Sequence, residues 1–80
     1  MITAFVLINV KKGELPQVAK ELGEIDEVVE VHSVSGKYDI ITKIQVQEYE
    51  RMSEVATEKL QLIDGITSTE TLMAFKMYKF

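Results

Sequence analysis

The segment VSGKYDIITKI, residues 34–44, decides the fold. β-Branched residues lie on both sides of an interruption at Ser35-Gly36-Lys37-Tyr38. Glycine at the first central position of a four-residue break is typical of a type II′ turn, whose twist suits two antiparallel strands. We therefore predict a β-hairpin with strands at residues 28–34 and 38–46.

The segments outside the hairpin predict two further strands and two helices. Residues 2–10, ITAFVLINV, are apolar on both alternating faces, which indicates a strand covered on both sides. A last strand is expected from residue 66 towards residue 80. Apolar residues at helical spacing predict a first helix ending near Gly23 and a second closed by Asp64-Gly65. They are Leu15, Val18, Ala19 and Leu22 in the first, and Tyr49, Met52, Val55, Ala56, Leu60 and Ile63 in the second.

The order strand, helix, strand, strand, helix, strand predicts an α+β ferredoxin-like βαββαβ fold. Right-handed crossovers place both helices on one face of a four-stranded antiparallel sheet and leave the other face bare. The first and last strands nevertheless carry apolar residues on both faces. Since monomers rarely expose such a surface, we expect a second copy of the sheet to cover it, giving a dimer.

Length and composition narrow the class of protein. Eighty residues make a single domain, 1–80, with no cysteine for disulfides, thiolate catalysis or cysteine-ligated metals. Net charge is −4 and the cations are scattered, which disfavours direct nucleic-acid binding. No apolar run approaches the roughly 20 residues that span a bilayer, and no cleavable signal is recognisable. We therefore expect a cytoplasmic protein without a membrane partner.

Catalytic motifs are absent from the sequence. There is no glycine-rich phosphate loop, GxSxG, HExxH or histidine pair, so we expect no enzyme, no metal and no cofactor. The lone His32 lies in mid-strand and is interpreted as a half-buried structural residue. The many carboxylates are interpreted as solvated surface charges.

The hairpin tip allows two interpretations. In the first, Ser35, Gly36 and Asp39 serve turn chemistry alone. In the second, the tip anchors a zwitterion: the Gly36 backbone approaches the ligand, and Asp39 either orients the loop or pairs with a cation. Tyr38 beside Asp39 is better explained by the second. The threonine row at 67, 69 and 71 likewise reflects strand propensity or lines a polar pocket.

Two patterns resemble a known family over the whole chain. The hairpin reads V-[ST]-G-x-x-D, with Val34, Ser35, Gly36 and Asp39 at its fixed positions. The last strand reads G-[VI]-x-x-[ST]-x-T, with Gly65, Ile66, Thr69 and Thr71. In this order and spacing the chain resembles the effector-binding (RAM) domain of the Lrp/AsnC transcriptional regulators.

The resemblance implies domains that dimerise through their sheets in a dimeric α/β barrel-like assembly. It further implies rings, commonly octamers, and amino-acid effectors bound between dimers beside the hairpin. Carried over by position, it nominates as ligand-binding residues Ser35, Gly36, Lys37, Tyr38 and Asp39, with Ser68, Thr69 and Thr71 as further candidates. Family regulators carry an N-terminal helix-turn-helix, whereas this chain begins with its first strand. It resembles a stand-alone effector domain that acts through a partner, such as a full-length Lrp/AsnC regulator.

Two alternative functions share the expected fold. A dimeric α/β-barrel enzyme of monooxygenase type would bind an aromatic or haem-like ligand within one dimer. A purely structural assembly domain would form rings without responding to a ligand.

Overall fold

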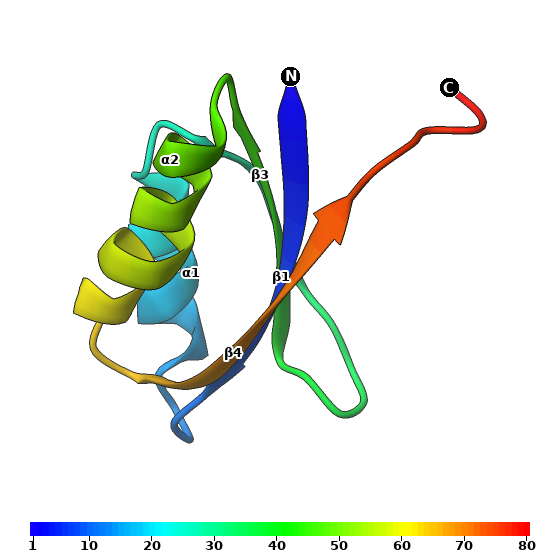
Figure 1. The fold of residues 1–80 in the computed structure, drawn as a ribbon. Coiled ribbons are helices and arrows are strands. Elements are labelled where there is room, and N and C mark those ends of the chain that lie inside the picture. Colours follow the sequence, from blue (N-terminus) through cyan, green and yellow to red (C-terminus); the bar gives the residue numbers. More distant parts are fainter.

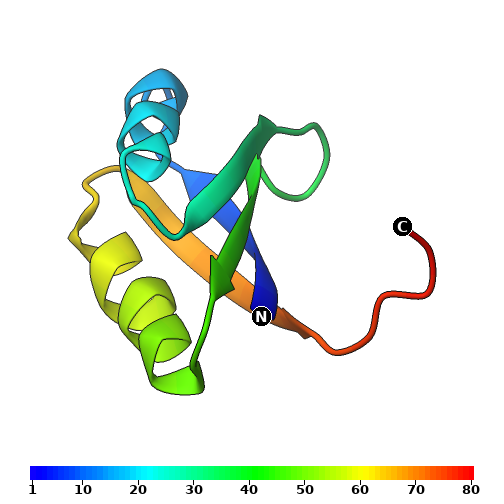
Figure 2. The same ribbon diagram turned by 90° about the horizontal axis from the view of Figure 1, so that it is seen from above.

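The computed structural model describes all residues from 1 to 80. Its elements follow in the order β1 (Ile2–Val10), α1 (Leu15–Gly23), β2 (Val28–Ser33), β3 (Ile40–Val46), α2 (Tyr49–Ser53), η1 (Glu54–Lys59), η2 (Leu60–Leu62) and β4 (Ile66–Ala74). The strands form one antiparallel sheet in the order β2-β3-β1-β4. Both helical segments cover the same face of this sheet (Figures 1 and 2). The predicted ferredoxin-like fold is confirmed.

The hydrophobic core lies between the sheet and the helices. Alternate residues of β1 and β3 point into it, among them Val6, Ile8 and Ile44, all fully buried. Leu22 of α1 and Leu60 of η2 close it from the other side. Such burial is worth about 1.5–3 kcal/mol for each large aliphatic side chain, so the core holds the helices on this face.

The second helix is less regular than its spacing predicts. One turn of α-helix is followed by the π-helical segment η1 and the short 3-10 segment η2. The N–H of Leu60 accordingly donates to the carbonyl of Val55, five residues back. Met52, Val55, Ala56, Leu60 and Ile63 are buried as expected, but Tyr49 is 66% exposed and does not belong to the apolar face.

The predicted hairpin is confirmed, but the predicted type II′ turn is wrong. β2 ends at Ser33 and β3 begins at Ile40, and the N–H of Val34 donates to the carbonyl of Asp39 at 2.9 Å. The hydrogen bond from the N–H of Tyr38 to the carbonyl of Ser35, which closes a regular type II′ turn, is absent. The reason lies in Asp39, whose N–H donates to Ile8 of β1 instead. Gly36 has the predicted positive φ, at 122°.

The sheet face opposite the helices is uncovered. We call it the open face; its large apolar residues are Phe5, Leu7, Ile41 and Leu72, which the strand pairing places side by side. The expectation of apolar residues on both faces is confirmed for β1. On β4 the open face carries Leu72 but also the polar residues Ser68 and Glu70, so its open face is mixed. β4 also ends at Ala74, short of the predicted range.

Gly65 occupies a position that only glycine fits well. Its φ is +99°, and an added Cβ would lie 3.0 Å from Cγ2 of Val18. Replacing Gly65 with alanine is expected to lower the free energy of unfolding by about 1–3 kcal/mol. Gly23 is the matched control: it has an ordinary φ and open space, so Gly23→Ala should raise stability by about 0.4–1 kcal/mol. Urea denaturation of both variants checks this, and equal effects would contradict it.

No helix in the structure is long and apolar enough to cross a membrane.

Candidate functional site

Asp39 ties the hairpin loop to the end of β1. Its backbone N–H donates to the carbonyl of Ile8 at 3.0 Å, and its Oδ2 accepts from the N–H of Val10 at 2.9 Å. Because this partly buried carboxylate accepts a backbone hydrogen bond, it fixes the hairpin loop and the end of β1 relative to each other. Of the two roles considered for Asp39, the geometry favours orientation of the loop.

Tyr38 makes a second tie, from the loop across the sheet to β4. Its hydroxyl donates to Oε1 of Glu70 at 2.5 Å, and Glu70 lies opposite Leu7 on the open face. The hydrogen bond to the Glu70 carboxylate raises the pKa of Tyr38 above its ordinary value of 10.0, because the phenolate would lose that bond. Sequence reasoning missed Glu70. The available signal was a single carboxylate interrupting the threonines of the last strand.

Ser35, Gly36 and Lys37 form the exposed tip of the loop. The Nζ atom of Lys37 lies 6.0 Å from the centroid of the Tyr38 ring, at the outer limit of a cation–π contact. The tip therefore presents an ammonium group, a hydroxyl and free backbone groups next to a phenol and two carboxylates. Such a set can bind both charges of a zwitterion.

The structure divides the candidates from the last strand between two faces. Ser68 lies opposite Asn9 on the open face, and its Oγ accepts a hydrogen bond from Asn9 Nδ2 at 3.2 Å. Thr69 and Thr71 lie opposite buried residues of β1 and so point to the helix side. Within one chain, Ser68 shares a face with the Tyr38–Glu70 pair, and the two threonines do not.

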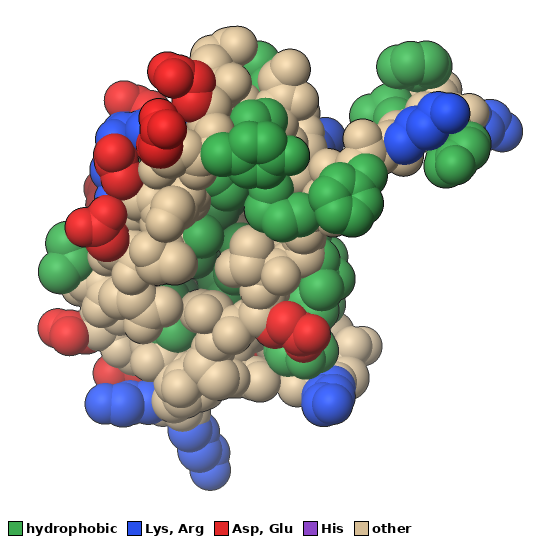
Figure 3. Space-filling model, viewed as in Figure 1, with side chains coloured by type: hydrophobic (Ala, Val, Ile, Leu, Met, Phe, Trp, Pro, Cys, Tyr) green, Lys and Arg blue, Asp and Glu red, His purple; other side chains and the backbone are tan.

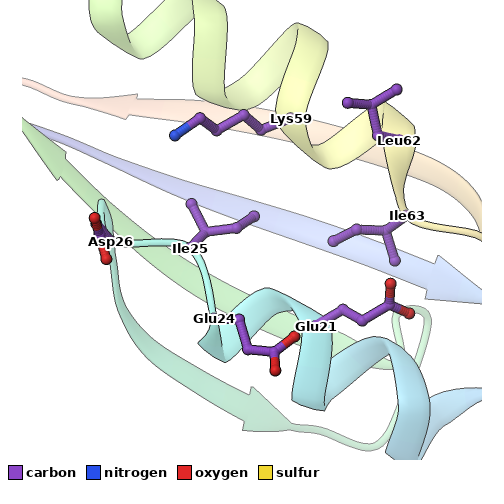
Figure 4. A pocket seen from close by; sticks show the side chains of 7 residues that line it. All are labelled: Glu21, Glu24, Ile25, Asp26, Lys59, Leu62 and Ile63. Carbon is purple, nitrogen blue, oxygen red and sulfur yellow. The ribbon is translucent and has the colours of Figure 1, made fainter.

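The hollows of the surface lie away from the hairpin loop. One of about 370 Å³ opens between the end of α1 and the second helix (Figure 4). Its lining is Glu21, Glu24, Ile25, Asp26, Lys59, Leu62 and Ile63. None of the nominated residues lines this hollow or either of the other two. The hairpin group is thus a surface that a single chain leaves open.

Lys59 at that hollow already has a structural partner. It donates to Glu27 at 3.1 Å, and Arg51 donates to the same carboxylate at 2.6 Å. Burial raises the pKa of Glu27, but the hydrogen bonds from Arg51, from its own backbone and from Lys59 outweigh this, and the pKa lies below its ordinary value. The three residues fasten the second helix to the segment before β2.

His32 differs from its expected setting. It lies on the open face opposite Ile41, is exposed, and its Nε2 is 2.9 Å from Oε1 of Glu30. The interpretation as a half-buried residue is wrong, because β2 is an edge strand with nothing packed over this end. No group of three histidine, aspartate or glutamate side chains converges in a way that could hold a metal ion.

Comparison with known proteins agrees with this architecture. Residues 3–80 match the model of the Lrp/AsnC ligand binding domain. The HTH-type transcriptional regulator FL11 of Pyrococcus furiosus is 35% identical over 78 residues, which are 98% of this chain and 51% of FL11. The chain therefore spans about half the length of this curated relative.

Solved structures show the same fold. The protein TTHA0845 of Thermus thermophilus superposes with a TM-score of 0.93 at 35% identity, covering 100% of both chains. The transcriptional regulator NMB0573 of Neisseria meningitidis, solved in complex with L-Met, gives a TM-score of 0.86 at 15% identity. That match covers 99% of this chain and 53% of the other. On its sequence, its fold and the family model, the chain belongs to the Lrp/AsnC ligand-binding domain family.

Proposed function

We propose that residues 1–80 form a non-enzymatic module that senses an amino acid, oligomerises and takes part in transcriptional regulation in the cytoplasm. The observation that carries the proposal is the hairpin loop, anchored by Asp39 and Tyr38 beside the open face, with polar groups that no other part of the chain encloses. A second chain is needed to complete such a site. Membership of a family named for ligand binding supports it.

The chemistry of the loop matches the two charges of a free amino acid. Lys37 and the backbone N–H groups beside Gly36 suit the α-carboxylate, and the carboxylates of Asp39 and Glu70 suit the α-ammonium. Oδ1 of Asp39 accepts no hydrogen bond within the chain. The complex of NMB0573 with L-Met shows that one protein of this fold binds an amino acid.

DNA binding is proposed to come from a partner. FL11 is an HTH-type regulator, and this chain matches about half of it. Cations in the chain are outnumbered by 13 acidic residues to 9, which disfavours phosphate contacts. Co-assembly of dimers into a ring, of which an octamer is the expected form, provides the means to join a full-length Lrp/AsnC regulator.

A thermal-denaturation screen against the twenty amino acids tests the sensing function. An amino acid at 100 times its dissociation constant stabilises the folded state by about 2.7 kcal/mol, so one or a few should raise Tm distinctly. The N-acetylated and amidated forms of the best ligand are the controls, and both should fail because each lacks one charge. Equal Tm values with all twenty would contradict the proposal. Stabilisation by an aromatic or haem-like compound alone would favour the enzyme alternative.

A further inference from the structure

We propose that residues 75–80, here called the tail, are an arm that packs against a second copy of this chain. The inference rests on the oligomerisation proposed above, in the form of the sheet-to-sheet dimer expected from the sequence, and extends it to a segment outside the fold. Phe75, Tyr78 and Phe80 are 91%, 87% and 106% exposed, and Met77 is also exposed. Single exposed apolar side chains are common on protein surfaces, but a cluster of large ones within six residues is not.

The tail lies on the same side of the sheet as the open face. The tail and the hairpin loop both project on the side of the sheet away from the helices (Figures 1 and 2). Figure 3 shows the hydrophobic side chains of the tail, with lysines between them, standing apart from the body. A second copy packed against the open face would therefore lie between the hairpin loop and the tail.

A hollow of about 370 Å³ opens at the base of the tail. Thr3 and Phe5 of the open face form one wall, and Phe75 and Met77 form the other. Most of its lining residues are hydrophobic. It offers an aromatic side chain a place where both the sheet and a tail contribute contacts.

Two-fold symmetry explains how the hollow is filled. In an isologous dimer each contact occurs twice, so the tip of one tail can enter the hollow at the base of the other. This arrangement buries the open face and both tails at once. A membrane surface would accept the aromatic residues and lysines of the tail but would leave Leu7 and Ile41 in water, so a second copy is the better occupant.

Charge gives the tail a long-range attraction to a second copy. Lys76 and Lys79 are the cationic side chains of the tail, whereas all 13 acidic residues lie in residues 1–74. Opposite net charges raise the association rate. The hollow itself is lined by Lys43 and Lys76, so the contacts proposed there are apolar.

Disulfide trapping tests the arm directly, because the natural chain has no cysteine. Thr3→Cys, in the hollow, and an affinity-tagged Tyr78→Cys are mixed and mildly oxidised. Mixed disulfides should form at least about tenfold faster than with Glu58→Cys, an exposed control on η1, because bonding requires Cα atoms within about 7 Å. Equal rates would overturn the proposal. So would a disulfide formed within one chain by the dilute Thr3→Cys/Tyr78→Cys double variant.

Sedimentation equilibrium of a Tyr78→Ser/Phe80→Ser variant separates this inference from the proposed function. Its dimer dissociation constant should rise at least about tenfold, while Leu62→Ser, an exposed control on the helix side, leaves it unchanged. A dimer of unchanged affinity would overturn the arm and leave the sheet association standing. Absence of a dimer in the natural chain would overturn both. Vesicle binding by the tail, with unchanged dimer affinity, would identify a membrane arm instead.

Discussion

Leu7→Glu is expected to convert the protein from the proposed dimer to a folded monomer. Leu7 lies on the open face between Ile41 of β3 and Glu70 of β4. A glutamate there faces the Glu70 carboxylate and has no cation opposite it. Because a two-fold interface receives the substitution twice, two unpaired charges become buried, each at a cost of several kcal/mol. The dimer dissociation constant should rise at least about 1,000-fold, which corresponds to about 4 kcal/mol.

Leu62→Glu is the matched control. Leu62 is 82% exposed at the end of the second helix, so the same change of residue and charge falls on the opposite side of the molecule. Sedimentation equilibrium should give the natural dissociation constant for this variant. Circular dichroism should show both variants folded, because Leu7 lies outside the core cluster. A Leu7→Glu protein that dimerises as tightly as the Leu62→Glu control would rule out association through the open face.

Periodicity made most of the fold predictable. The apolar residues at alternate positions of β1 that face the helices, and the 3–4 spacing in α1, are driven by burial within this chain, and the structure confirms both. Local patterns succeed where the residues that recognise each other are near in sequence or share one face. Tyr49 shows the limit: its spacing fits the second helix, but it precedes the part of the helix that meets the core, and it is exposed.

The hairpin shows where local reasoning ends. Gly36 and its positive φ were predictable from turn chemistry alone. The shape of the loop was not, because it is set by hydrogen bonds that join Asp39 to Ile8 and Val10, which lie about thirty residues earlier. The Tyr38–Glu70 hydrogen bond likewise joins residues 32 apart. Contacts of this kind leave no periodic signal in the sequence.

The last strand ends earlier than the sequence predicts. Met73, Phe75 and Met77 alternate as residues on one face of a strand do, which is why the sequence predicts a longer last strand. In the structure the pairing of β1 with β4 stops at Thr3 and Ala74. An apolar pattern that finds no partner in its own chain is consistent with the proposal that the tail packs against a second copy.

Asp39→Ala is expected to damage both the fold and the proposed site. The substitution leaves the N–H of Val10 without its acceptor in a partly buried place and removes one of the two hydrogen bonds that hold residue 39 to β1. Loss of a hydrogen bond to a charged group costs about 1.5–3 kcal/mol, so the free energy of unfolding should fall by that amount. Urea denaturation without ligand measures it. A change below about 0.5 kcal/mol, the size of an ordinary surface substitution, would show that this tie contributes little.

Asp39→Asn separates the two roles of this residue. The amide oxygen can still accept from Val10, so stability should fall by about 1 kcal/mol or less, the worth of a neutral hydrogen bond. The negative charge is gone, however, and an α-ammonium would lose its charged partner. Calorimetric titration with the amino acid chosen by the screen should therefore show binding at least about tenfold weaker in a well-folded Asp39→Asn protein. Unchanged affinity there, beside a destabilised Asp39→Ala variant, would restrict Asp39 to holding the loop and assign the ammonium to Glu70.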